Sequence, residues 1–385
     1  MIRDLDLLEA LEDSVARFVR DRLIPLERQV DEADALPDGM VQEFRDLGLF
    51  GLSIPEDHGG LGLTMEEEVR VAFRLGRTSA AFRSLIGTNN GIGSQAIVMD
   101  GTDAQKARYL PRLASGEIIG SFALTEPGAG SDAASLTTRA FRDGDHYVLN
   151  GTKRYITNAP HAGLFTVFAR TGTSEERARG ISAFLVEAPR DGLHLGPPDR
   201  KMGQKGAHVC DVVFEDCRVP ADALLGGVEG RGFASAMKVL DRGRLHISAV
   251  CVAQAERLID DTLVYAMDRR QFGVPLADQQ LVQAMLAESR AECLSARSMV
   301  LETARAKDTG ADIATDAACC KLFASEMVGR VADRAVQIHG GAGYMAEYGI
   351  ERFYRDVRLF RIYEGASEIQ KLVIARGMIR AAGSG

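Results

Sequence analysis

Residues 121–132 read Ser-Phe-Ala-Leu-Thr-Glu-Pro-Gly-Ala-Gly-Ser-Asp, and this segment has the composition of a ligand-binding turn. Gly128 and Gly130 allow the backbone to come close to a flat, polar ligand. The hydroxyls of Thr125 and Ser131, together with free backbone amides, can then bind ring heteroatoms or phosphate oxygens. The alternative interpretation is a glycine-rich hairpin that binds no ligand.

The same glycines, with Ala133, also fit the dinucleotide-binding fingerprint GxGxxA. That fingerprint requires a helix after the glycines. Here, Asp143-Gly144 lies between two apolar runs, which is a hairpin signal. We therefore expect strands after the glycines and no Rossmann fold.

Glu364 is the candidate for acid–base chemistry. It stands between an aromatic residue and a glycine, just before a helix that we expect to begin near Ala366. A carboxylate with apolar neighbours is poorly solvated and therefore more basic, which suits a general base that removes a proton from carbon. The alternative interpretation is a glutamate that caps the helix.

Three other segments offer groups for anions. Residues 337–344, Gln-Ile-His-Gly-Gly-Ala-Gly-Tyr, hold more glycines than a helix C-cap needs, whereas His339 is readily explained as a packed, hydrogen-bonded residue. The arginines at 269–270 either complement a helix dipole or bind pyrophosphate. A buried Arg244 would need an anionic or acyl-carrier partner, or a carboxylate such as that of Asp241.

The composition limits the classes of protein. The chain has 385 residues, 46% hydrophobic and 26% charged, with a net charge of −8, and it contains no basic block that would favour nucleic acid. The six cysteines lack metal-ligand spacing, so we expect reduced thiols. The N-terminus does not resemble a signal peptide, and no apolar run approaches the roughly 18 residues of a membrane span. We expect a cytoplasmic protein.

Three regions must position these groups. Residues 4–118 show helical spacing of apolar residues, and residues 119–230 show short strands separated by turns, typical of a small antiparallel barrel or sandwich. Long amphipathic helices are expected at about 233–268, 278–308 and 312–338, with a shorter one after Ala366, which predicts an antiparallel bundle. We expect an α+β chain with domains at 1–118, 119–230 and 231–385.

The joint order of the motifs resembles the acyl-CoA dehydrogenase family over nearly the whole chain, from about residue 5 to residue 378. The motifs are Phe-Ala-Leu-Thr-Glu-Pro-Gly-Ala-Gly-Ser-Asp at 122–132, Asn-Gly-Thr-Lys-Arg-Tyr-Ile-Thr-Asn at 150–158, Phe-Glu-Asp-Cys-Arg-Val-Pro at 214–220, Arg-Arg-Gln-Phe-Gly at 269–273, Gln-Ile-His-Gly-Gly at 337–341 and Tyr-Glu-Gly at 363–365. The resemblance implies a helical N-terminal domain, a middle antiparallel β-barrel and a C-terminal four-helix bundle. It also implies FAD as cofactor, a homotetramer built from dimers and an electron-transfer flavoprotein as electron acceptor.

The resemblance also implies roles for individual residues. Contacts to FAD would come from Phe122, Leu124, Thr125, Tyr155, Thr157, Ala366 and Glu368, with Ser131 reaching the FAD phosphate or the CoA arm. The FAD of a neighbouring subunit would be held by Arg269, Gln271, Phe272, Gln337, Gly340 and Gly341. The acyl-CoA would contact Ser131, Asp241, Arg244, Tyr363 and Gly365.

The reaction that the resemblance implies is the α,β-dehydrogenation of fatty acid β-oxidation. Glu364 would remove the α-proton, and the β-hydrogen would leave as hydride to flavin N5. The thioester carbonyl would be hydrogen-bonded by the FAD ribitol 2′-hydroxyl and by the Glu364 amide. Some branched-chain and very-long-chain members carry their base just before the arginine that aligns with Arg244, where this chain has Gly243, so the base position matches short- and medium-chain members.

The chain departs from the family pattern at two flavin positions. Tyr155 stands where Trp is commoner, and Ala366 replaces a common Thr. Two other functions remain open at this stage. One is an oxidase-like protein of the same fold that passes electrons to oxygen, and the other is an acyl-CoA binding protein without turnover.

Overall fold

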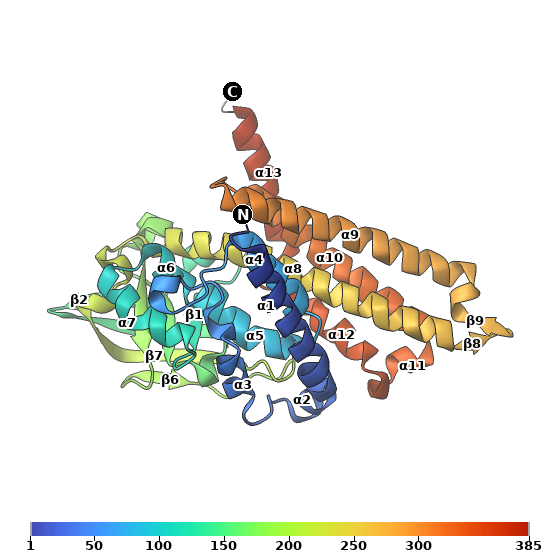
Figure 1. Ribbon diagram of the computed structural model, residues 1–385. Coiled ribbons are helices and arrows are strands. Elements are labelled where there is room, and N and C mark those ends of the chain that lie inside the picture. Colours follow the sequence, from blue (N-terminus) through green and yellow to red (C-terminus); the bar gives the residue numbers. More distant parts are fainter. Residues whose placement is uncertain (1, 384–385) are drawn as a thin grey trace.

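The computed structural model describes residues 2–383, and its elements follow the expected order of helices, strands and helices (Figure 1). The N-terminal helices are α1 (Leu5–Phe18), α2 (Glu27–Ala33), α3 (Met40–Asp46), α4 (Met65–Leu75), α5 (Ala80–Thr88), α6 (Gln95–Asp100) and α7 (Asp103–Ala114). A π-helical turn at Asn89–Gly93 connects α5 with α6. Helix α4 begins at a capping box in which Thr64 and Glu67 satisfy each other's backbone amides.

A seven-stranded sheet forms the middle of the chain. Its strands are β1 (Gly120–Ala123), β2 (Arg139–Asp143), β3 (His146–Thr157), β4 (Leu164–Arg170), β5 (Ile181–Glu187), β6 (Leu193–Leu195) and β7 (Val209–Pro220). They lie in the order β1-β4-β2-β3-β7-β6, with β5 paired to β4. The predicted hairpin at Asp143-Gly144 joins β2 to β3, and no helix longer than the 3-10 turn at Ala133–Ser135 follows the glycines, so the Rossmann alternative is excluded.

The expectation of a purely antiparallel sheet is wrong around β4, which pairs in parallel with β1 and, at Arg139 and Arg170, also with β2. A parallel pair needs a long crossover, and the β2–β3 hairpin lies within the connection between β1 and β4. The short strand β6 was not anticipated.

The C-terminal part consists of long helices. They are α8 (Gly232–Asp268), α9 (Gln280–Asp308), α10 (Ala314–His339), α11 (Gly341–Tyr344), α12 (Ile350–Val357) and α13 (Ser367–Gly383), with the two-stranded hairpin β8 (Arg270–Gln271) and β9 (Val274–Pro275) between α8 and α9. The three predicted long helices are confirmed to within two residues at each end. Helix α13 projects away from the rest of the molecule and carries the C-terminus (Figure 1). The exact domain boundaries remain a prediction.

Helix α8 joins the three parts of the molecule. Its middle, around Leu245 and Val250, is buried in a core shared with α4, α9 and α10. Its first residue lies so close to β5 that a Cβ on Gly232 would meet the Ser182 carbonyl carbon at 2.3 Å. About three turns later, Gly243 faces Ile92 of the π-helical turn. This stretch of α8 therefore lies where the sheet and both sets of helices meet.

Two smaller expectations concern cysteines and membranes. All six cysteines are free, and five of them are buried. Within residues 2–383, no helix combines the length and apolar character needed to cross a bilayer.

Candidate active site

The Glu364 carboxylate lies against α8 and does not cap α13. Its Oε2 atom is buried without a hydrogen-bond partner, and it lies 2.8 Å from the position that a Cβ on Gly243 would take. The absence of a side chain at residue 243 is therefore what gives the carboxylate its place. The helix-capping alternative is wrong, and what remains is a buried acceptor oxygen without a hydrogen-bond partner.

The loop that carries Glu364 has an unusual backbone. Glu364 has φ +53° and Gly365 has φ +89°, both in the left-handed region. Two side chains hold this conformation: Lys321 Nζ donates to the Gly365 carbonyl at 2.7 Å, and Gln370 Nε2 donates to the Glu364 and Gly365 carbonyls at 3.1 and 2.8 Å. Lys321 is fully buried on α10, and burial lowers its pKa. These bonds fix the direction in which the Glu364 side chain leaves the backbone.

Arg244 follows Gly243 on α8 and lies beside the same loop. It is 6% exposed, its Nη1 atom donates to Asp241 Oδ1 at 2.5 Å, and its Nε atom is buried without a partner. Burial raises the pKa of Asp241, although the Arg244 charge opposes this. Arg244 Nη2 is 3.8 Å from where a Cβ on Gly365 would stand. The alternative of a carboxylate partner for Arg244 is thus confirmed, and one of its donors still lacks an acceptor.

The turn after β1 and the end of β3 lie together, as predicted. The Arg154 amide donates to the Thr125 carbonyl at 2.8 Å, and the Ser121 hydroxyl donates to the Thr157 carbonyl at 2.6 Å. Phe122 is buried against Phe168, with ring centroids 4.7 Å apart, and Leu124, two residues later, is buried as well. Phe122, Leu124, Thr125 and Thr157 therefore belong to one surface.

A buried ion pair fixes this surface from below. Lys153 Nζ donates to the Leu124 carbonyl at 3.1 Å and to Glu126 Oε1 at 2.8 Å. The other Glu126 oxygen accepts from the amide and the hydroxyl of Thr137. Burial alone would raise the pKa of Glu126, but the Lys153 charge and these hydrogen bonds lower it to about 2. Both members of the pair are therefore charged at neutral pH.

The outer side of this surface is open. Tyr155 has φ +58° and a 59% exposed side chain, and a Cβ added to Gly128 or Gly130 would meet nothing within 4 Å. Ser131 is exposed beside them. An open aromatic ring next to unobstructed backbone fits a large flat group with polar edges.

The remaining predicted cofactor residues lie at the other end of the bundle. Arg269, Gln271 and Phe272 belong to the end of α8 and the β8–β9 hairpin, which lie opposite the sheet (Figure 1). They are exposed, as are Gln337, Gly340 and Gly341 at the end of α10. Arg244 and Arg269 are 25 residues apart on α8, which corresponds to about 37 Å. One chain therefore does not bring these residues to the Glu364 site.

The predicted residues next to Glu364 in sequence differ in how buried they are. Tyr363, Gly365 and Ala366 are half-buried in the same loop, whereas Glu368 is exposed on the first turn of α13. His339 stacks on the Tyr265 ring at 4.1 Å and its Nδ1 atom lies 2.8 Å from the Ala335 carbonyl, so it is a packed histidine, as the alternative stated.

Sequence reasoning missed the groups that support the site. Lys321 and Lys153 were not singled out, although a lysine inside the apolar run Ala-Ala-Cys-Cys-Lys-Leu-Phe-Ala is a signal of a buried ammonium. Gln370 and Arg83 were missed as well. These side chains are buried by neighbours that are far away in the sequence, so the spacing of residue types along the chain does not predict their burial.

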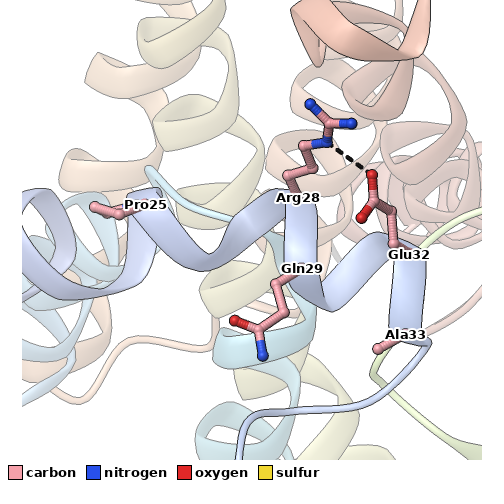
Figure 2. Close-up of a pocket in the computed structure, with 5 residues that line it drawn as sticks. All are labelled: Pro25, Arg28, Gln29, Glu32 and Ala33. Atoms are coloured by element: carbon pink, nitrogen blue, oxygen red, sulfur yellow. Dashed lines mark hydrogen bonds and ion pairs between the residues drawn. The ribbon is translucent and has the colours of Figure 1, made fainter.

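Two surface hollows lie away from this site. Figure 2 shows one of them along α2 and the 3-10 turn at Ile24–Leu26 before it. It is lined by Pro25, Gln29 and Ala33 together with the exposed ion pair of Arg28 and Glu32, 2.7 Å apart. The other lies between α10 and α12. Neither contains the Glu364 carboxylate or the open surface near Tyr155, so neither is a candidate for the chemistry.

Comparison with known proteins gives matches over nearly the whole chain. Three family models match: the acyl-CoA dehydrogenase N-terminal domain at residues 6–117, the middle domain at 121–217 and the C-terminal domain at 230–379. The chain is 41% identical to probable acyl-CoA dehydrogenase YngJ of Bacillus subtilis, over 97% of this chain and 98% of that protein. It is 40% identical to the human mitochondrial short-chain specific acyl-CoA dehydrogenase, over 94% and 88% of the two chains.

Solved structures agree in fold. A chain from the study of the electron transferring flavoprotein of Acidaminococcus fermentans superposes with a TM-score of 0.95 at 34% identity, covering 99% of this chain and 100% of that one. An acyl-CoA dehydrogenase from Bacillus anthracis complexed with FAD superposes with a TM-score of 0.92 at 34% identity, covering 99% of this chain and 68% of that one.

Proposed function

The chain belongs to the acyl-CoA dehydrogenase family, and on that premise we propose that it oxidises the C2–C3 bond of an acyl-CoA thioester to the trans-2-enoyl-CoA, with Glu364 as the base. The observation that carries the proposal is the unpaired Oε2 atom of Glu364, which occupies the space left free by Gly243. A carboxylate oxygen without a hydrogen-bond partner is available to take a proton from substrate.

The family is FAD-dependent, and the residues present fit that cofactor. The ring would lie on the surface of Phe122, Leu124, Thr125, Tyr155 and Thr157, because Tyr155 is open and the backbone at Gly128 and Gly130 is unobstructed. Ala366 and Glu368 would approach it from the Glu364 loop, and Ser131 would reach its phosphate or the CoA arm. When bound, FAD supplies the acceptor for the β-hydride.

The chain's own residues would align the substrate. Glu364 would take the α-proton onto its carboxylate, while its backbone amide would donate to the thioester carbonyl as negative charge develops there. Lys321 and Gln370 would keep this loop from moving because they bind its carbonyl groups. Arg244, paired to Asp241, together with Tyr363 and Gly365, would contact the acyl-CoA.

The two separated sets of cofactor residues support a homo-oligomer. The FAD site of a neighbouring chain would be completed by these exposed residues at the far end of the bundle, where Arg269 is about 37 Å from Arg244 along α8: Arg269, Gln271, Phe272, Gln337, Gly340 and Gly341. The 96% exposed Phe272 is an apolar ring that such a contact would cover. We propose a homotetramer of two such dimers, with an electron-transfer flavoprotein as the electron acceptor.

Flavin bleaching tests the proposal. The purified protein should be yellow, and an acyl-CoA added without oxygen should bleach it. The Glu364→Gln variant should still bind acyl-CoA but reduce the flavin at least about a hundredfold more slowly, in line with general-base contributions. Glu117→Gln, which changes an exposed surface glutamate, is the matched control and should behave as wild type.

Other outcomes would favour the alternatives. Rapid consumption of oxygen with formation of peroxide during turnover would indicate an oxidase. A protein that binds acyl-CoA yet remains colourless after addition of FAD would indicate a binding protein. Near-normal bleaching by Glu364→Gln would show that Glu364 is not the base.

A further inference from the structure

A buried arginine close to the Glu364 site lacks an acidic partner. Arg83 lies on α5 and is 7% exposed. Its Nε atom donates to His246 Nε2 at 3.3 Å, and no carboxylate within residues 2–383 is paired with it. A guanidinium is always charged, and burying it without an anion is costly.

The neighbouring groups do not neutralise Arg83. Glu68 is the acid that joins this network through His246, but one of its oxygens is bound by Arg242 and the other lies 2.9 Å from His246 Nδ1. Burial lowers the pKa of His246, and the Arg83 charge lowers it further, so the ring is neutral and serves as an acceptor toward Arg83. Within this hydrogen-bonded network, Arg83 therefore has no carboxylate partner of its own.

The contacts of Arg83 place it near the loop that carries Glu364. His246 lies three residues after Gly243 on α8, on the same helix face, and Gly243 faces both Glu364 and Ile92. Burial raises the pKa of the Tyr363 hydroxyl, and Arg83 is the charge that opposes this most strongly. Arg83 thus approaches the loop of the catalytic base from the side of α5.

A glycine makes room for this arrangement. A Cβ on Gly87, one turn after Arg83 on α5, would lie 2.7 Å from Arg83 Nε and 3.0 Å from its Nη2. Any other residue at position 87 would displace the guanidinium. The arginine therefore lies folded along α5 toward the π-helical turn at Asn89–Gly93, which also carries Ile92.

We propose that Arg83 is a specificity-determining residue, and that the acyl group of the substrate ends in a carboxylate that this guanidinium binds. The proposal rests on the proposed acyl-CoA oxidation. A planar guanidinium forms two parallel hydrogen bonds to a carboxylate, which supplies the missing anion. An acyl group that ends in a methyl would leave the charge buried and unpaired, so the site selects against it.

A matched set of acyl-CoAs tests this. Each straight-chain acyl-CoA that ends in a carboxylate is compared with the one of the same length that ends in a methyl group. At the preferred length, wild-type FAD-loaded protein should show a kcat/KM at least about tenfold higher for the carboxylated member. Arg83→Met should lower that value by about tenfold to a hundredfold, the range for a buried charge-assisted hydrogen bond, and leave the methyl-ended member unchanged or improved.

Equilibrium binding gives a second measurement that does not depend on turnover. In the Glu364→Gln background, isothermal titration should show the same loss of affinity for the carboxylated acyl-CoA when Arg83→Met is added. Arg83→Lys should restore part of it, because the charge returns without the planar fork. Arg74→Met, which removes an arginine paired with Glu12 elsewhere in the N-terminal part, controls for net charge and should leave selectivity intact.

The outcomes separate the two proposals. If methyl-ended acyl-CoAs bleach the flavin and carboxylated ones neither bleach nor bind more tightly, Arg83 is not a carboxylate site, although the dehydrogenase proposal stands. If Arg83→Met weakens both members of each pair equally, its role is structural. If no acyl-CoA bleaches the flavin, the dehydrogenase proposal fails, and the titration alone decides the role of Arg83.

Discussion

The glycine at position 243 gives the sharpest test of the base. A Cβ in Gly243→Ala would lie 2.8 Å from Glu364 Oε2, whereas ordinary contacts begin at 3.4 Å, so the carboxylate oxygen must move by about 0.6 Å. Because this oxygen is the end of a flexible side chain, the fold should accommodate it, and alanine should stabilise α8 by about 0.5–1 kcal/mol relative to glycine. A base misplaced by 1 Å can cost about a hundredfold in rate, so we expect flavin reduction to slow by about ten- to a hundredfold.

Anaerobic stopped-flow bleaching under saturating acyl-CoA measures this effect directly. The loss should appear in the reduction rate, while the acyl-CoA dissociation constant and the melting temperature stay near wild type. Gly377→Ala is the matched control, because its Cβ would also meet a side-chain oxygen, Thr315 Oγ1 at 2.2 Å, yet it lies about 15 Å along α13 from the Glu364 loop. A Gly243→Ala protein that reduces its flavin at the wild-type rate would refute the placement of the Glu364 carboxylate.

Three further changes test stability, pH dependence and cofactor retention. Lys153→Met should lower the free energy of unfolding by about 3–5 kcal/mol, because it leaves the Glu126 carboxylate buried without its cation. Adding Glu126→Gln should recover most of this loss in urea titrations. A double variant as unstable as Lys153→Met alone would contradict a stabilising ion pair. Burial raises the pKa of Asp356 from 3.8 to about 6, so the folded protein keeps a proton that the unfolded chain has released, and stability should fall by roughly 3 kcal/mol as pH rises from about 4 to 6. Asp356→Asn should flatten that slope in thermal melts at a series of pH values, and an unchanged slope would assign it to another group. Tyr155→Ala should weaken FAD binding about tenfold while Tyr155→Phe does not, measured by fluorescence of released FAD; equal retention by both would mean that the ring does not stack on the flavin.

The sequence predicted the elements well because their signals are local. Helical periodicity and turn residues placed the helix at 233–268 within one residue of Gly232–Asp268. The parallel pairing of β1 with β4 was missed because it joins strands that are separated by a hairpin, and no local pattern reports which distant strand lies alongside. The order of the motifs indicated the family, but it did not predict which strands pair in the sheet.

The sequence predicted the reactive residue of the site but not the side chains that hold it in place. Glu364 was recognisable because an aromatic residue, a glutamate and a glycine precede a helix, yet its helix-capping alternative could be rejected only once its carboxylate was seen against Gly243. Lys321 comes from a helix more than forty residues earlier, and its hydrogen bond to Gly365 depends on how α10 packs under the loop. Buried partners of this kind are tertiary properties.

Backbone strain connects the separate parts of the proposed site. Eight non-glycine residues within 2–383 have positive φ, and three of them, Tyr155, Phe272 and Glu364, are among the residues predicted to hold cofactor or substrate. A left-handed residue other than glycine costs about 1–2 kcal/mol, so glycine would be the better choice for folding at each position. At each position the strained backbone instead carries a side chain that is free to bind or react. Tyr155 and Phe272 present exposed rings, the second of them 96% exposed, and Glu364 presents a carboxylate oxygen without a hydrogen-bond partner. Strain of this kind persists where surrounding bonds hold it, as Lys321 and Gln370 do at the Glu364 loop, and it is typical of sites that bind or react. Phe272, far from the other two in one chain, then has a reason for its strain only if a second chain brings its own flavin surface to that end of the bundle.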